Sequence, residues 1–283
     1  MNSTPNNERR ATASARPDAS PRSPGLTFLA RFRKRRLVAV FTILLLLIAW
    51  QIAVSAGTFA SYVLPGPLTV LRQFPQLIAH GFARQSLGTD IVVSVFRVAV
   101  GFAGAVLIGV PIGLLMGRVE LLFDAIDPLL QFGRPIPPLA YIPLLIVWFG
   151  IGELPKILLI LVGTLPVIII NTILGVRTTP PQRIRVAQCL GATPFQIFSY
   201  VIFPSALPAI FTAMKVGIGF AWTYLVAAEL VAADSGLGWL VWQAGQQIQV
   251  TIIMQGIIII GLLGYGMELC IRALERTVVR GGG

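Results

Sequence analysis

Long apolar runs separated by short polar or basic stretches dominate this sequence. Several runs approach or exceed the roughly 18 consecutive apolar residues that a helix needs to cross a bilayer. The pattern predicts an all-α membrane protein with about six transmembrane helices and with both termini in the cytoplasm. The expected spans are 37–56, 91–116, 121–150, 157–176, 206–233 and 251–273.

The third run is interrupted by Gly133-Arg134-Pro135-Ile136-Pro137-Pro138, and two interpretations remain open. A single broken span would leave backbone groups that must pack against protein or line a wet path, as at the binding sites of many transporters. The alternative is a surface helix over 124–132 followed by a separate short span.

Three features are expected near the outer face of the membrane. The stretch 68–80 predicts an amphipathic surface helix that ends at the only histidine, His80, which we expect to be solvated. The stretch 239–249 predicts a Trp- and Gln-rich outer segment. Arg97 lies about one turn inside its span, and we expect its long side chain to snorkel to the headgroups.

Composition and charge support a membrane protein. The chain has 283 residues, is 55% hydrophobic and 12% charged, and has a mean hydropathy of +0.82, which excludes an ordinary soluble domain. Its net charge of +11 does not indicate nucleic-acid binding, because many of the basic residues precede the first span. Such a cluster holds that end of a chain in the cytoplasm and against anionic lipid.

These patterns divide the chain into three parts. Residues 1–36 are predicted to form a disordered basic cytoplasmic tail, and 37–90 the first transmembrane helix and a periplasmic segment. Residues 91–276 form the membrane domain, with a cytoplasmic loop at 177–208. Cys189 and Cys270 lack metal-ligand spacing and are predicted to be ordinary reduced thiols.

The 177–208 loop carries the signals of two short helices. Pro181 suits a first helical turn, and Gly191 can adopt the left-handed conformation that ends a helix. Thr193 then offers an N-cap oxygen for a second helix, which we expect to end at Pro204. The residues expected on the inner faces are Ile184, Ala187, Leu190, Phe195, Phe198 and Ile202. The pattern indicates a compact docking element, although a plain basic loop is the simpler alternative.

Sequence motifs for catalysis are absent. The sequence has no phosphate-binding loop of the form G-x-x-x-x-G-K-[ST], no metal-ligand spacing and one isolated histidine. We therefore expect a transport subunit without a metal or cofactor of its own, and not an enzyme. Any ATP hydrolysis, with its Mg²⁺, would belong to a partner.

The loop resembles the "EAA" signature of bacterial ABC importer permeases, in which it couples the permease to the ATPase subunit. The matching residues are Ala187, Gly191, Val201, Phe203 and Pro204. Arg185 occupies the position of the signature's Glu and Val186 that of its first Ala, so the usual acidic contact is absent. The resemblance implies an ATPase-coupling role for Arg185, Ala187, Gly191, Ala192 and Pro204.

Three further stretches, 134–140 with 148–153, 221–230 and 235–238, look like the permeases of taurine, alkanesulfonate and nitrate importers. The similarity runs from about residue 91 to the C-terminus and is closest to taurine permeases. It implies a type I ABC importer transmembrane domain in the bacterial inner membrane. The partners implied are a second permease copy, two ATPase subunits and a periplasmic binding protein.

The resemblance also suggests a cargo and a path. The implied cargo is taurine or a related organosulfonate; the alternatives are nitrate, bicarbonate or an aromatic acid, or else a self-sufficient secondary transporter. The candidate substrate-path residues are Arg134, Trp222, Thr223 and Tyr224. A sulfonate is a permanent anion, so a fixed cation such as Arg134 would suit it. A purely structural role for Arg134, paired with Asp124 or Asp127, is the alternative.

Overall fold

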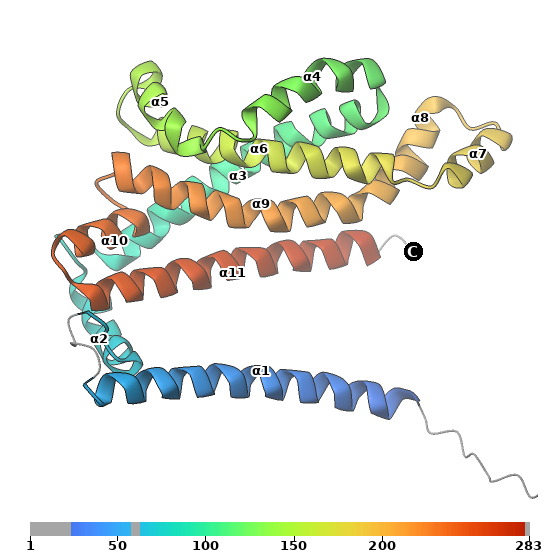
Figure 1. Cartoon of the computed structure of the whole chain (residues 1–283). Helices are drawn as coiled ribbons and strands as arrows, with labels where there is room; N and C mark the ends of the chain where they lie inside the picture. The colour runs from blue at the N-terminus through green and yellow to red at the C-terminus, as the bar shows by residue number, and fades with distance from the viewer. Residues whose placement is uncertain (1–23, 58–62, 281–283) are drawn as a thin grey trace, which may run out of the picture. The chain divides into compact units, whose positions relative to one another are not determined.

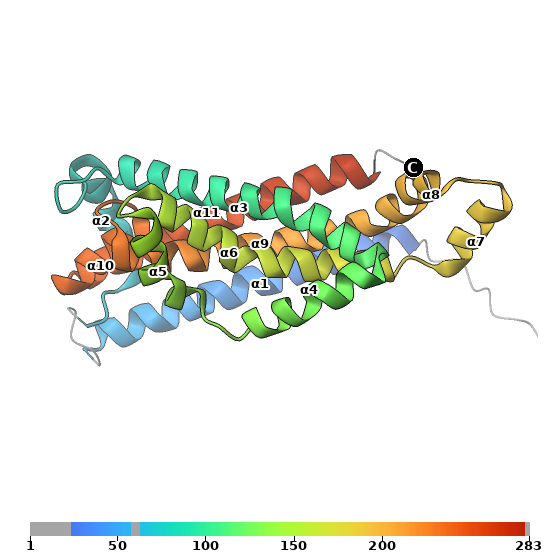
Figure 2. The same ribbon diagram turned by 90° about the horizontal axis from the view of Figure 1, so that it is seen from above.

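The computed structural model describes residues 24–57 and 63–280, and over these ranges the regular secondary structure is helical apart from one isolated bridge between Phe82 and Gln85 (Figures 1 and 2). The first helix, α1 (Pro24–Ser55), falls almost wholly in a unit of its own, whereas the following helices form a second unit. Helix α1 begins inside the predicted tail 1–36, because Leu, Ala, Arg and Lys after residue 25 are good helix formers. The rest of that predicted tail, 1–23, lies outside the described residues.

The second unit contains four long apolar helices, as the sequence predicts. They are α3 (Leu87–Arg118), α6 (Glu153–Arg177), the continuous helix Pro194–Ala232 that includes α9 (Phe203–Ala232), and α11 (Val250–Arg280). A fifth span exists if α4 (Glu120–Gly133) is counted with the segment Pro138–Phe149. The all-α membrane architecture is therefore confirmed, with four or five candidate spans in the described residues where the sequence predicts about six. The predicted first span, 37–56, corresponds to a shorter apolar helix, Val40–Ser55.

The break in the third apolar run is a sharp bend. Helix α4 and the following 3₁₀ turn η1 (Pro138–Tyr141) with α5 (Ile142–Phe149) meet at 92°. Prolines at this point cannot continue α4, since they lack the N–H that the helix requires. The bend places η1 beside α6 and α9.

The short helices outside the long spans also follow the expectations. Helix α2 (Pro67–His80) coincides with the predicted surface helix, and α10 (Leu237–Gln246) overlaps the predicted Trp- and Gln-rich segment 239–249. Between α6 and α9 lie α7 (Pro181–Cys189), α8 (Pro194–Ile197) and the π turn η2 (Phe198–Ile202).

Helix α6 packs against both α3 and α9, and α11 packs against the other side of α9 (Figure 1). The α3–α6 contact is close because glycines recur on one face of α3. A Cβ atom at Gly113 would lie 2.6 Å from Thr172 Cβ, and one at Gly117 would lie 2.6 Å from Val176 Cβ. Small residues of this kind let helices approach within lipid, where van der Waals packing replaces the hydrophobic effect.

Candidate functional site

The 177–208 loop forms the predicted pair of helices. Helix α7 ends in a Schellman motif, in which Gly191 has φ +78° and donates its N–H to Gln188 O over 2.9 Å, while Ala192 donates to Ala187 O over 3.0 Å. No atom lies within 4 Å of a Cβ atom built at Gly191, so the glycine is needed for its conformation alone.

Helix α8 begins with the predicted cap. Thr193 Oγ1 accepts a hydrogen bond from Gln196 N at 3.3 Å, and Gln196 Oε1 accepts one from Thr193 N at 2.7 Å. This reciprocal capping box fixes the turn between α7 and α8. Arg118 from the end of α3 donates to Pro194 O at 3.3 Å and lies over the Phe198 ring, which ties the loop to the membrane domain.

The predicted helix end at Pro204 is wrong. The chain passes from α8 through the π turn η2 directly into α9, and Pro204 lies in the first turn of α9. In the π turn the Phe203 N–H bonds to Phe198 O, five residues back. The wider turn accommodates a proline that would clash with a carbonyl in a regular α-helix.

The predicted inner faces of the loop are partly wrong. Ile184, Ala187, Ala192 and Phe198 pack on a buried cluster that contains Ile197, Ile202 and Ala206. Leu190 and Phe195, however, are 82% and 77% exposed. Leu190 is the residue before the left-handed Gly191 and Phe195 lies in the first turn of α8, so both side chains project beyond the packed faces.

A groove of about 530 Å³ lies beside the loop. It is lined by Gln182, Arg183, Val186, Tyr200, Val201, Pro204 and Ser205. Tyr200 is 78% exposed and Val186 60% exposed, so the loop presents an apolar surface. Arg185, which replaces the usual acidic residue, is also exposed but does not line the groove.

A second cavity, of about 540 Å³, lies at the bend between α4 and η1 and is lined on its other sides by α6 and α9. We call it the Arg134 cavity. Its polar lining residues are Arg134, Tyr141, Asn171 and Tyr224, and the remaining lining residues are apolar or glycine. Among the described residues, Arg134 is therefore the only charged one in the lining. Two of the four predicted path residues, Arg134 and Tyr224, share this cavity.

Arg134 has no carboxylate partner within the described part of the chain. Its Nη1 donates a hydrogen bond of 3.4 Å to Gln131 Oε1, and Asp127 instead accepts from Gln131 Nε2 at 3.5 Å. The structural pairing of Arg134 with Asp124 or Asp127 is thus not observed.

The other two predicted path residues lie elsewhere on α9. Trp222 is buried on the α11 side, where a Cβ atom at Gly264 would lie 3.4 Å from its Cδ1. Thr223 is exposed and donates to Gly219 O at 3.1 Å. Neither lines the Arg134 cavity, because successive residues of a helix point in different directions. Tyr224, by contrast, lies against Gly163 of α6 and stacks on Phe220.

Residues 109–280 match the protein family described as binding-protein-dependent transport system inner membrane component. The chain belongs to this family. It is a permease subunit of an ABC importer, a multi-pass protein of the bacterial inner membrane.

Two relatives and one solved structure agree with this assignment. The permease is 37% identical over 242 residues to the taurine transport system permease protein TauC of Escherichia coli (85% of this chain, 88% of TauC). It is 35% identical over 242 residues to the nitrate import permease protein NrtB of Synechocystis (84% and 87%). An inward-facing structure of the MetNI methionine ABC transporter matches with a TM-score of 0.55 and 25% identity, covering 66% of this chain and 95% of that one.

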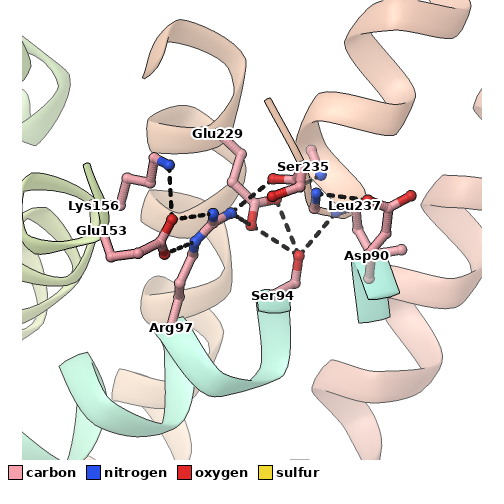
Figure 3. A network of polar contacts seen from close by, with 10 residues as sticks. Asp90, Ser94, Arg97, Glu153, Lys156, Glu229, Ser235 and Leu237 are labelled. Atoms are coloured by element: carbon pink, nitrogen blue, oxygen red, sulfur yellow. Dashed lines mark hydrogen bonds and ion pairs between the residues drawn. The ribbon is translucent and has the colours of Figure 1, made fainter. Parts of the chain in front are cut away.

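The expected snorkelling of Arg97 is wrong. In the permease Arg97 is fully buried and lies in a network that joins α3, α6 and α9 (Figure 3). Its Nε and Nη2 donate to the two carboxylate oxygens of Glu153 at 2.6 and 2.7 Å, and its Nη1 donates to Glu229 Oε1 at 2.7 Å and Ser235 O at 2.8 Å. The buried Glu229 and the half-exposed Glu153 satisfy the charge within the protein, so the side chain need not reach the headgroups.

The network extends beyond Arg97, and we call the whole set the Arg97 network. Its other members are Asp90, Ser94, Glu153, Lys156, Glu229 and the backbone of 235–238. The stretches 221–230, which contains Glu229, and 235–238 stand out in the sequence, but nothing in their pattern predicts that they meet. The available signal was the number of ionisable residues near the ends of apolar runs, since charges there need partners.

Proposed function

We propose that this permease forms the translocation path for taurine or a related organosulfonate. The observation that carries the proposal is the unpaired charge of Arg134 in an otherwise uncharged cavity. Arg134 is exposed at the edge of this cavity, where an unpaired cation attracts an anion, and a guanidinium can donate two parallel hydrogen bonds to sulfonate oxygens. The 37% identity to TauC supports this cargo, and the 35% identity to NrtB makes nitrate the alternative.

The coupling loop, 177–208, is proposed to bind the ATPase subunit. Leu190, Phe195 and Tyr200 are 82%, 77% and 78% exposed there. Such a surface suits a protein partner. Arg185 adds a positive charge where related permeases carry Glu, so the facing ATPase surface should be neutral or acidic.

The complete importer is proposed to contain two copies of the permease, two ATPase subunits and a periplasmic binding protein. The coupling loop then faces the cytoplasm, together with both termini, and the Arg97 network faces the periplasm. ATP and Mg²⁺ bind in the ATPase subunits, whose closure pulls the two coupling loops together and opens the path outward. Val216 and Phe220 line the Arg134 cavity and are exposed on α9, a face that a second copy can cover.

Reconstitution tests the machine and the cargo together. The permease is purified with its ATPase and binding protein, and ATP hydrolysis is measured in proteoliposomes with taurine, with nitrate and without either anion. Stimulation that needs both the binding protein and taurine supports the proposal. Stimulation by nitrate and not by taurine would support the importer assignment and identify nitrate as the cargo. An absence of any complex with an ATPase would contradict the assignment and favour a secondary transporter.

Substitutions at Gly191 test the coupling loop. Gly191→Val forces a β-branched residue to φ +78°, where left-handed backbone costs roughly 1–2 kcal/mol per residue. We expect loss of coupled transport while the protein remains inserted. Gly191→Asn is the matched control, because Asn tolerates this conformation and no neighbouring atom obstructs a side chain. Unchanged transport and ATPase stimulation in Gly191→Val would contradict the coupling role of the 177–208 loop.

A further inference from the structure

The start of α10 is held by side chains of two other helices. The N–H groups of Gly236, Leu237 and Gly238 donate to Asp90 Oδ1, Ser94 Oγ and Glu229 Oε2 at 2.8, 2.8 and 2.7 Å. The first N–H groups of a helix have no partner within it. Here α3 and α9 supply those partners, so α10 cannot shift against them without losing three buried hydrogen bonds.

Glu229 is the centre of this connection. Its carboxylate accepts from Ser94 Oγ at 2.8 Å, from Arg97 Nη1 at 2.7 Å and from the Gly238 N–H, and the residue is fully buried. The turn is shaped around it: Gly236 has φ +116°, and a Cβ atom there would collide with the Glu229 carboxylate. The Ser235–Gly238 turn and Glu229 therefore act as one packed unit.

The helix that carries Glu229 also carries the coupling loop at its other end. Residues Pro194–Ala232 form one continuous helical span of 39 residues, from the α8 cap to three residues beyond Glu229. Figure 1 shows α8 leading into α9 and α10 lying at the opposite end of α9. A displacement at one end of a continuous helix is transmitted to its other end more directly than a displacement that must pass through several loops.

The residues of α10 and the following turn are open to an external partner. Trp242 and Ile248 are 48% and 71% exposed, and Gln246, Gln247 and Gln249 are exposed as well. Uncharged amides with an aromatic side chain form an adaptable contact surface. The buried charges behind it make this surface part of the membrane domain instead of a loose loop.

We propose that the Arg97 network is a rigid joint through which a binding protein on α10 displaces α9 and thereby the coupling loop. This inference rests on the proposed function. Arg97, Glu229 and Ser94 are positioning residues, which contact neither cargo nor ATP. Their contribution is to make α10 and α9 move as one body.

Distance measurements between spin labels test the joint without any transport assay. The native, exposed Cys189 on α7 carries one label in a Cys270→Ser background, and the second label is attached at Gln247→Cys or at Val231→Cys. Labelled chain is diluted into unlabelled chain in the complex, so that only distances within one chain are recorded. Val231 is on α9 and 59% exposed, and it serves as the reference for the helix itself.

In Glu229→Gln, which keeps the shape but removes the charge, we expect the Cys189–247 distance distribution to broaden by about twofold, as in a locally released segment. The Cys189–231 distribution should stay narrow. Glu268→Gln is the matched control, because Glu268 forms an ion pair with Arg272 within α11, away from the joint. If Glu229→Gln does not fold, Ser94→Ala removes the acceptor of the Leu237 N–H and leaves the ion pair intact.

Stimulation of ATP hydrolysis by the binding protein gives the functional result. We expect stimulation in Glu229→Gln to fall about tenfold, within the range of allosteric couplings, and to be unchanged in Glu268→Gln. A narrow Cys189–247 distribution in Glu229→Gln overturns the joint, and so does broadening of both distributions, which indicates general loosening. Broadening without loss of stimulation also overturns the proposal. If no binding protein stimulates ATP hydrolysis by the wild type, the proposed function fails. The distance distributions would then show only that α10 and α9 are held together, and the proposed transmission to the coupling loop would be overturned.

Discussion

The Arg97 network and the Arg134 cavity each place an arginine among apolar helices, and they treat its charge in opposite ways. Arg97 is fully buried and donates to two carboxylates and a carbonyl. Arg134 lies at the helix bend with one long hydrogen bond to Gln131 and no carboxylate among its contacts in the described residues. The same residue type is therefore satisfied by the chain at one site and left unsatisfied at the other.

The difference separates two uses of charge within a membrane domain. A buried ion pair whose groups are fully hydrogen-bonded holds helices in register, and removal of one partner leaves the other charge stranded. A cation without a partner is available to an external anion. The contrast assigns position to Arg97 and cargo contact to Arg134, and substitutions at the two sites can break it.

The largest effect is expected for Arg97→Met. This change leaves the buried Glu229 without its cation, a loss of about 3–5 kcal/mol for a broken buried pair. Glu153 contributes less, because its side chain is 51% exposed. We expect loss of the folded protein, measured as thermal stability in detergent and as yield from membranes. Normal stability in Arg97→Met would show that the network does not hold the helices together.

Lysine substitutions compare the two sites directly. At Arg97 a lysine keeps the charge but cannot reach Glu153, Glu229 and Ser235 from one ammonium group, so we expect a loss of about 1–3 kcal/mol in unfolding free energy. At Arg134 a lysine keeps the unpaired charge, and we expect normal stability with most transport retained. Equal tolerance of lysine at both positions, measured by the same melting assay, would remove the distinction between them.

Arg134→Ala should reduce transport without loss of assembly. The substitution removes the one charged side chain that the described residues contribute to the cavity lining. We expect transport of the anion to fall about tenfold, roughly the value of one charge-assisted hydrogen bond. Uptake into proteoliposomes and co-purification with the ATPase are measured on the same preparation. Loss of assembly would return Arg134 to a structural role, and unchanged uptake would remove it from the path.

Sequence reasoning predicted the elements well because their signals are local. Apolar run length located the long helices, and the Gly191 and Thr193 signals located both sides of the turn in the coupling loop. The helix end predicted at Pro204 is wrong because a single π turn, which no residue pattern predicts, continues the helix beyond this residue. Local signals thus predict where helices begin and turn more reliably than where they continue.

The roles of charged residues were harder to predict because their partners are distant in sequence. Arg97 is separated from Glu153 by 56 positions and from Glu229 by 132. Depth in a span suggested snorkelling, and only the packing of α3 against α6 and α9 shows that acceptors are available. Similarly, Trp222 and Tyr224 are two residues apart, but only the arrangement of neighbouring helices reveals which of them faces the cavity.

The smallest expected effect concerns the shape of the Arg134 cavity. Gly163 of α6 lies against Tyr224, and a Cβ atom there would be 2.5 Å from the ring's Cδ2 and Cε2 atoms. Gly163→Ala should therefore displace the ring, with a loss of about 1 kcal/mol from overpacking and a several-fold fall in uptake. Gly261→Ala is the matched control, since no atom within the described chain lies within 4 Å of its Cβ and alanine favours the helix by about 1 kcal/mol. If Gly163→Ala melts earlier but transports normally, Tyr224 belongs to the packing of α6 on α9, and the path is defined by Arg134 without it.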